Sequence, residues 1–144
     1  MKSKQVLSIK QMKHLWELGL DTSDASLYWV RKSHGSRIDD ESKGNWFLSL
    51  QKEFIISGFT AYEIIPTYTL QDIIGKLPRY VGDFGTNYKM HIEPVFAGPW
   101  CISYQRGACE QFVFKLEKNP LDASYEMLCW CIENGYIENK KAEI

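Results

Sequence analysis

The sequence lacks the long apolar runs that membrane proteins require. No stretch approaches the roughly 18 consecutive apolar residues of a transmembrane helix. The N-terminal stretch of residues 1–13 is basic, but it contains no continuous apolar segment of the kind found in a secretory signal peptide. These two absences predict a cytoplasmic protein that has no membrane partner.

The sequence also has no excess of positive or negative charge. The chain has 17 lysines and arginines against 18 aspartates and glutamates, so its formal net charge is −1, and its pI is about 6.3. Nucleic-acid-binding domains commonly have a basic stripe or a pI above about 9. The basic residues nearest the N-terminus are more typical of a solvated arm: Lys2, Lys4, Lys10 and Lys13. Nucleic acid is therefore not the expected partner.

The short motifs of common catalytic and cofactor sites are missing. The chain contains no GxGxxG, GxxxxGK[ST], HExxH, GxSxG or CxxC sequence. Two of the four cysteines, Cys129 and Cys131, are two positions apart on a predicted helix and point about 200° apart, so they cannot pair or share a metal. We expect no catalytic residue, no metal and no cofactor, and the four cysteines are interpreted as reduced thiols.

What is present is the composition of an ordinary folded domain. Of 144 residues, 44% are hydrophobic and 24% charged, and a chain of this length can bury a core without a metal or disulfide. We expect one globular domain over residues 1–144, with flexible ends at about 1–7 and 138–144. The 14% aromatic content either fills the core or leaves rings for a partner.

Three helices are predicted from their N-terminal capping residues. Ser8 with Gln11 forms a capping box ahead of a helix over 9–18, and Thr69 caps a helix over 70–77. Asn119 precedes a proline, which suits the first position of a helix, so a third helix is predicted over 120–134.

Strands are predicted between these helices. Residues 27–32 and 46–50 suggest a hairpin with a long tip, and 62–65 is a short strand ended by Pro66. The course of residues 51–60 is ambiguous. The order is therefore α-βββ-α-βββ-α: an α+β fold with an antiparallel sheet of about five to six strands and helices packed on one face.

The clearest pattern is a three-strand meander over residues 88–117. Its segments alternate with a period of two and are separated by turn sequences. The expected apolar face is Tyr88, Met90, Ile92, Trp100, Ile102, Tyr104, Phe112, Phe114 and Leu116. A sheet with one apolar face must be covered, and we expect the helix over 120–134 to cover it.

That helix is apolar on two sides, which makes Met127 and Trp130 the candidate interaction surface. With Ala123 they lie opposite a stripe of Leu121, Tyr125, Leu128 and Ile132, which we assign to the sheet. Either the helix over 9–18 covers the Met127 and Trp130 side as a second layer, or Trp130 anchors a protein partner or a second copy.

A second candidate is the polar face of the meander. Lys89, His91 and Glu93 alternate with the apolar residues of the first strand, and Cys101 and Ser103 are expected near them on the next. A histidine, a carboxylate and a thiol on one face suit proton transfer or metal binding. A solvent-facing sheet surface commonly has the same mixed character, so both interpretations stay open.

Three segments, residues 66–73, 123–130 and 133–137 (PTYTLQDI, ASYEMLCW and ENGYI), resemble a group of small uncharacterised bacterial proteins, some of them carried by prophages or mobile elements. The resemblance implies a bacterial cytoplasmic setting and no activity. We interpret the chain as a non-enzymatic protein-interaction or accessory module with a protein partner or homodimer. The alternative is a small-ligand or metal-binding protein, or an enzyme, that uses the His91 and Glu93 face.

Overall fold

A computed structural model describes residues 4–34, 45–50, 60–82, 87–107 and 110–138 of the chain. Residues 51–59, whose course the sequence left ambiguous, lie outside these residues. The elements are, in order, α1 (Ile9–Glu17), β1 (Leu27–His34), β2 (Phe47–Ser49), β3 (Thr60–Thr67), α2 (Leu70–Lys76), β4 (Tyr80–Val81), β5 (Tyr88–Pro94), β6 (Trp100–Arg106), β7 (Glu110–Glu117) and α3 (Pro120–Glu133).

The α+β class is confirmed, but the single sheet is wrong. The strands of the described chain form two antiparallel sheets, one in the order β2-β1-β3 and one in the order β4-β5-β6-β7. The second contains a strand, β4, that the sequence did not predict; its two residues are too few for a periodic pattern. The predicted hairpin of β1 and β2 is present.

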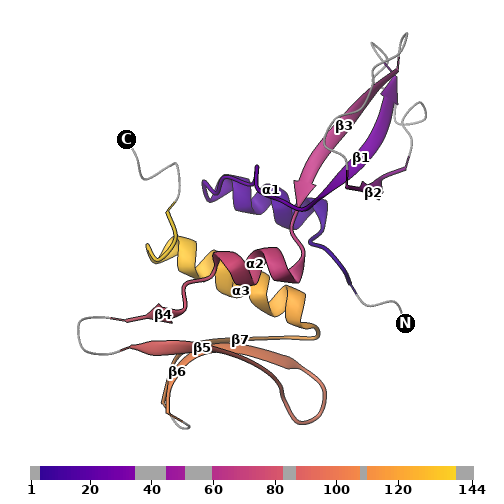
Figure 1. Cartoon of the computed structure of the whole chain (residues 1–144). Helices are drawn as coiled ribbons and strands as arrows, with labels where there is room; N and C mark the ends of the chain where they lie inside the picture. The colour runs from indigo at the N-terminus through magenta and orange to yellow at the C-terminus, as the bar shows by residue number, and fades with distance from the viewer. Residues whose placement is uncertain (1–3, 35–44, 51–59, 83–86, 108–109, 139–144) are drawn as a thin grey trace.

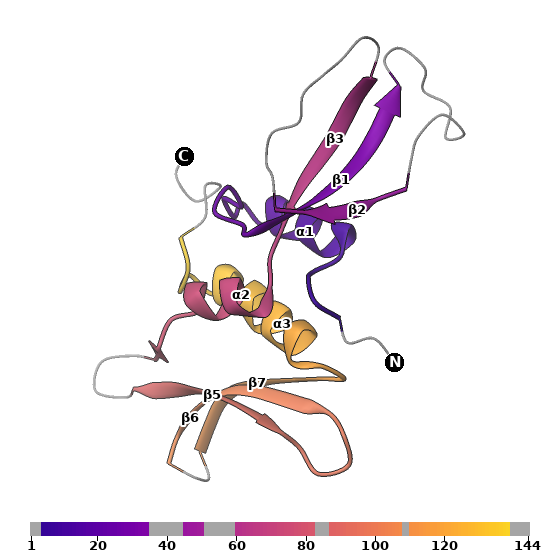
Figure 2. The same ribbon diagram turned by 45° about the vertical axis from the view of Figure 1, so that its right-hand side comes forward.

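Figures 1 and 2 show the elements stacked in layers. The four-stranded sheet forms one end of the molecule, α3 lies across one of its faces, and α2 lies beside α3. α1 lies beyond these helices, and the three-stranded sheet projects at the opposite end. One core runs through these layers, and its fully buried members include Leu7, Met12, Leu15, Tyr68, Ile73, Ile102, Tyr104, Met127 and Leu128.

The three predicted helix starts are confirmed because each depends on hydrogen bonds between near neighbours. The Gln11 N–H donates to Ser8 Oγ at 3.1 Å, and the Ser8 N–H donates to Gln11 Oε1 at 2.9 Å. Thr69 forms the same reciprocal pair with Asp72. Pro120 occupies the first turn of α3, and its cap residue Asn119 accepts from the Asp122 N–H.

The end of β3 differs from the prediction, since Pro66 lies inside the strand. It pairs with Tyr28 of β1, and the strand continues to Thr67. β3 is an edge strand of its sheet, and a residue without an N–H is tolerated at an edge where that position faces away from the neighbouring strand.

The meander of β5, β6 and β7 under α3 is confirmed, but the predicted face of β7 is wrong. A bulge between Tyr104 and Gln105 leaves Phe112 without a partner on β6, and beyond it Val113 pairs with Tyr104. Directly paired residues of antiparallel strands point to the same side, so Val113 faces α3. Phe114 lies one position further and points away, as does Leu116.

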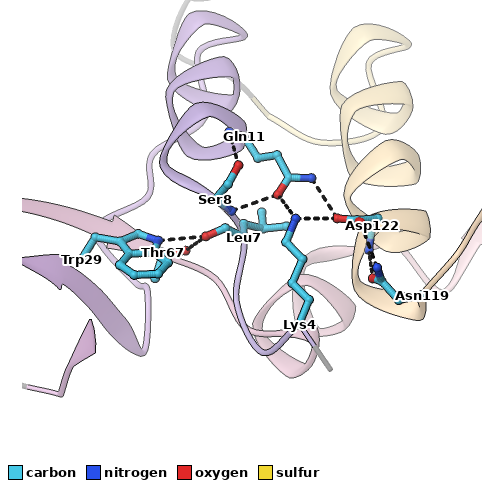
Figure 3. A network of polar contacts seen from close by, with 8 residues as sticks. All are labelled: Lys4, Leu7, Ser8, Gln11, Trp29, Thr67, Asn119 and Asp122. Carbon is cyan, nitrogen blue, oxygen red and sulfur yellow. Dashed lines mark hydrogen bonds and ion pairs between the residues drawn. The ribbon is translucent and has the colours of Figure 1, made fainter. Parts of the chain in front are cut away.

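Residues 4–7 are not part of the flexible end that we expected over residues 1–7; residues 1–3, and residues 139–144 of the other expected flexible end, lie outside the described ones. Within this N-terminal segment, Val6 is 4% exposed and Leu7 is fully buried. The Leu7 carbonyl accepts from Trp29 Nε1 at 2.9 Å and from Thr67 Oγ1 at 2.7 Å (Figure 3). These bonds attach the segment to β1 and β3 before α1 begins.

A second set of bonds attaches the same segment to α3. Lys4 Nζ lies 2.9 Å from Asp122 Oδ1, and Gln11 Nε2 donates to the same oxygen at 2.9 Å (Figure 3). Asn119 Nδ2 donates to the other carboxylate oxygen. Burial alone would raise the pKa of Asp122, but the hydrogen bonds from Gln11, Lys4 and Asn119 outweigh it and hold this pKa below its usual value.

Candidate interaction surface

The side of α3 that carries Met127 and Trp130 faces the protein's own sheet. Met127 is fully buried and Trp130 is partly buried. The Trp130 ring packs edge-on against Phe112 of β7, with ring centres 5.9 Å apart, and stacks on Tyr136 at 5.5 Å. Met127 therefore adds nothing to an exposed surface, and the expectation of an uncovered Met127 and Trp130 face is wrong.

The two sides of α3 are reversed relative to the prediction. Cys131 Sγ lies 4.0 Å from Tyr104 Oη on β6. The side of α3 that carries Cys131 and Trp130 therefore packs on the four-stranded sheet. Tyr125, which we had assigned to the sheet, instead packs edge-on against His14 of α1 at 6.3 Å. α1 does supply a second layer, but over the side opposite to the one we expected.

The polar side chains of β5 are placed as predicted. His91 pairs with Ser103, Glu93 with Cys101, and Lys89 with Gln105, so these side chains share the sheet face that points away from α3. The strand register therefore brings the histidine, the carboxylate and the thiol onto one surface.

The chemistry of that surface gives little support to a reactive site. Burial raises the pKa of Cys101, and the nearby Glu93 carboxylate raises it further, so the thiol stays protonated at neutral pH. A protonated thiol is neither a nucleophile nor a good metal ligand. Within the parts of the chain that the structure describes, no three histidine, cysteine or acidic side chains are grouped so that they could hold a metal ion.

Two exposed apolar side chains of the four-stranded sheet, Phe114 and Leu116, lie on this same outer face. Phe114 is 50% exposed and Leu116 is 48% exposed. The β5–β6 hairpin adds Val95 and Phe96 at the end of the sheet where β7 ends, and Phe96 is 98% exposed. We call Phe114 and Leu116, together with Val95 and Phe96 of the hairpin at that end of the sheet, the outer apolar surface. No other helix or strand of the described chain lies over this face (Figures 1 and 2).

Sequence reasoning missed this surface because the bulge at Phe112 changes which residues face inward. The Phe112 ring lies on the α3 side, 4.9 Å from Tyr88 and 5.9 Å from Trp130. One signal could have found it: Val113 is apolar, although the simple alternation placed it on the polar face. Four apolar residues within 112–116 indicate a strand that is apolar on both faces.

A shallow groove of about 760 Å³ lies between α1 and α3. Ile9 and the buried Tyr125 contribute apolar surface, and Lys10, Lys13, Glu17 and Glu126 contribute charges of both signs. His14 also lines the groove, 3.8 Å from Glu17. The mixed charges favour neither an anionic nor a cationic ligand, so the groove points to no class of ligand.

Comparisons with models of known protein families, with curated proteins and with solved structures found no match. In the described part of the chain, no helix is both long and apolar enough to span a membrane. The described cysteines, Cys101, Cys129 and Cys131, are free thiols.

Proposed function

We propose that this chain is a non-enzymatic protein-interaction module of a bacterial cytoplasm, and that it binds a protein partner through the outer apolar surface. The observation that carries the proposal is the exposure of Phe114, Leu116 and Phe96 on one sheet and its hairpin. Folded proteins commonly expose single apolar residues, whereas grouped large ones are typical of contact surfaces.

The composition of this face supports a protein partner over a small ligand. Phe114 and Leu116 lie on the same face as Lys89, His91 and Glu93, with strand β6 between them, so this face combines an apolar part with a polar part. Protein interfaces have this anatomy, with apolar anchors that exclude water and a polar rim. The free cysteines are consistent with a reducing compartment.

The test compares capture of partners by two matched variants. Phe114→Asp places a charge in the outer apolar surface, and Phe47→Asp makes the same change at a residue of similar exposure, 45%, on β2. Tagged wild type and both variants are incubated with lysate of the source organism, and bound proteins are quantified by mass spectrometry. We expect a set of proteins that wild type and Phe47→Asp retain and Phe114→Asp loses.

Two outcomes would reject the proposal. One is equal capture by all three proteins, and the other is equal loss from both variants. Circular dichroism must first show that both variants are folded, since an unfolded variant loses partners for an unrelated reason. If Phe114→Asp does not fold, Phe96→Asp replaces it, because a hairpin residue that is 98% exposed can be changed without disturbing the core.

The alternative proposal is binding of a metal or small ligand by the polar part of the same face. The observation in its favour is the register that places His91 opposite Ser103 and Glu93 opposite Cys101. Titration of the wild type and of His91→Ala with Zn²⁺, followed by calorimetry, tests it. The alternative requires binding by the wild type that His91→Ala abolishes.

A further inference from the structure

The outer edge of β7 is open among the described strands, because β7 pairs only with β6. Its first half is distorted by the bulge at Phe112, but its second half, from Val113 to Glu117, pairs regularly with β6. An open edge with exposed apolar side chains is a template for an added strand, and a bulge restricts where that strand can pair. The segment available for pairing is therefore the second half of β7.

Charged residues on the inner face of this half of β7 further restrict which strand can pair with it. Lys115 pairs with Ile102, and Glu117 pairs with Trp100, so both charged side chains lie on the half-buried side of β7 that faces α3. Within the described residues, neither side chain forms an ion pair. An inward-pointing charge at an edge opposes pairing with most strands, because the added strand must supply a matching charge.

The same segment of a second copy supplies the matching charges in one register. In an antiparallel pair with two-fold symmetry, directly opposite residues lie on the same face, so one residue sits opposite itself. With Leu116 opposite itself, Lys115 lies opposite Glu117 of the second copy, and the symmetry repeats this pair.

The neighbouring registers are less favourable. With Lys115 at the centre, the two copies of Lys115 lie opposite each other, and like charges in that position repel. With Phe114 at the centre, Lys115 lies opposite Val113, and the pairing must extend across the bulge at Phe112. Only the Leu116-centred register gives each inward charge an opposite charge.

From this charge complementarity we propose that the protein partner is a second copy of this chain, which binds at the β7 edge of the outer apolar surface by antiparallel pairing of β7 with β7 about Leu116. This inference rests on the proposed function and names its partner. The pairing joins two four-stranded sheets into one sheet with both α3 helices on the same side. On the outer face, Leu116 meets Leu116 of the second copy, and Phe114 lies on either side of this contact.

Sedimentation equilibrium with charge-reversal variants tests the register. Lys115→Glu and Glu117→Lys each place like charges opposite each other at two symmetric positions. Each single variant should therefore weaken the dimer by about tenfold or more. The double variant Lys115→Glu/Glu117→Lys restores both pairs with reversed polarity, so it should dimerise within about threefold of the wild type. A double variant that is weaker than either single variant would overturn the register.

A disulfide trap gives an independent test. Leu116→Cys, made with Cys101→Ala and Cys109→Ala so that those thiols cannot compete, should form a covalent dimer on mild oxidation. Residues directly opposite each other in paired strands have Cα atoms about 4.5–5.5 Å apart, which a disulfide spans. Phe114→Cys in the same background is the control, and dimerisation of this variant in preference to Leu116→Cys would overturn the Leu116-centred register.

The wild-type sedimentation result separates this inference from the proposed function. A monomer at concentrations up to about 1 mM, where even weak dimers form, overturns the homodimer. If Phe114→Asp still loses captured proteins under that result, the outer apolar surface binds a different protein and the proposed function stands. If capture is also unaffected, both proposals are rejected.

Discussion

Replacing Asp122 by Asn should lower stability at neutral pH, and the loss should depend on pH. The carboxylate accepts hydrogen bonds from Lys4, Gln11 and Asn119, and it lies in the first turn of α3, where the helix dipole favours a negative charge. Asn keeps the shape of the side chain and one acceptor oxygen but removes the charge. The variant therefore removes the charge together with one of the two acceptor oxygens.

The expected magnitude follows from the partial exposure of the pair. The Lys4 and Asp122 side chains are 33% and 27% exposed, so their ion pair contributes no more than about 1 kcal/mol. The helix dipole adds about 0.3–1 kcal/mol. We expect Asp122→Asn to lower the free energy of unfolding by about 1–2 kcal/mol at pH 7. For a chain of this size that corresponds to a fall in melting temperature of roughly 2–8 °C.

The pH dependence has a definite sign. The pKa of Asp122 is lowered in the folded state, so its stabilisation is fully present above the unfolded pKa, about 3.9, and is lost as the pH falls through the lower folded pKa. The wild type and Asp122→Asn should differ most at pH 6–7, and their difference should shrink as the pH falls below about 4.

Urea denaturation followed by tryptophan fluorescence, at several pH values, measures this difference. Glu126→Gln is the matched control, because it removes a charge from the same helix at a residue with no ion pair among the described residues, and it should change stability by less than about 0.5 kcal/mol. A double-mutant cycle with Lys4→Met should give a coupling of about 0.5–1 kcal/mol. A loss of stability that is the same at pH 3.5 and pH 7 would refute the reasoning.

Two further predictions test the inner face of the sheet and helix. Met127→Ala removes a fully buried side chain and should lower the free energy of unfolding by about 2–5 kcal/mol, whereas Leu50→Ala, at a residue 79% exposed, should change it by less than about 0.5 kcal/mol. Equal melting temperatures for Met127→Ala and Leu50→Ala would contradict this prediction. Val113→Asp places a charge against the core and should prevent stable folding, while Phe114→Asp, one position later, should fold. If circular dichroism melts showed a folded Val113→Asp and an unfolded Phe114→Asp, the position of the bulge would be contradicted.

The parts of the fold that the sequence predicted are those decided by near neighbours. Ser8, Thr69 and Asn119 each bond to a residue three positions away, so their helix starts could be recognised from the sequence. The alternation in β5 and β6 likewise identified Ile102 and Tyr104 as core residues. Both kinds of signal are complete within a few consecutive positions.

The parts that the sequence did not predict depend on distant partners. The bulge at Phe112 is a property of the pairing between β6 and β7, and it decides that Phe114 faces outward. The division of the strands into two sheets depends in the same way on which strands meet. Trp130 was a reasonable candidate because α3 is apolar on two sides, but only the packed structure shows that Phe112 and Tyr136 cover its ring. The location of the candidate surface on β7 was therefore beyond local pattern analysis.

The attachment of the N-terminal segment also determines the order in which the molecule can be completed. Lys4 and its partner Asp122 are 118 positions apart, so a ribosome has made nearly the whole described chain before this contact can form. Val6 and Leu7 can reach their partners in β1 and at the end of β3 earlier, but the Lys4 contact must wait until α3 has been made. Contacts of such separation slow folding, because a large loop must close before they contribute. Folding during synthesis should therefore end with the N-terminal segment binding the first turn of α3, and the newly made protein is exposed to aggregation and proteolysis until that step.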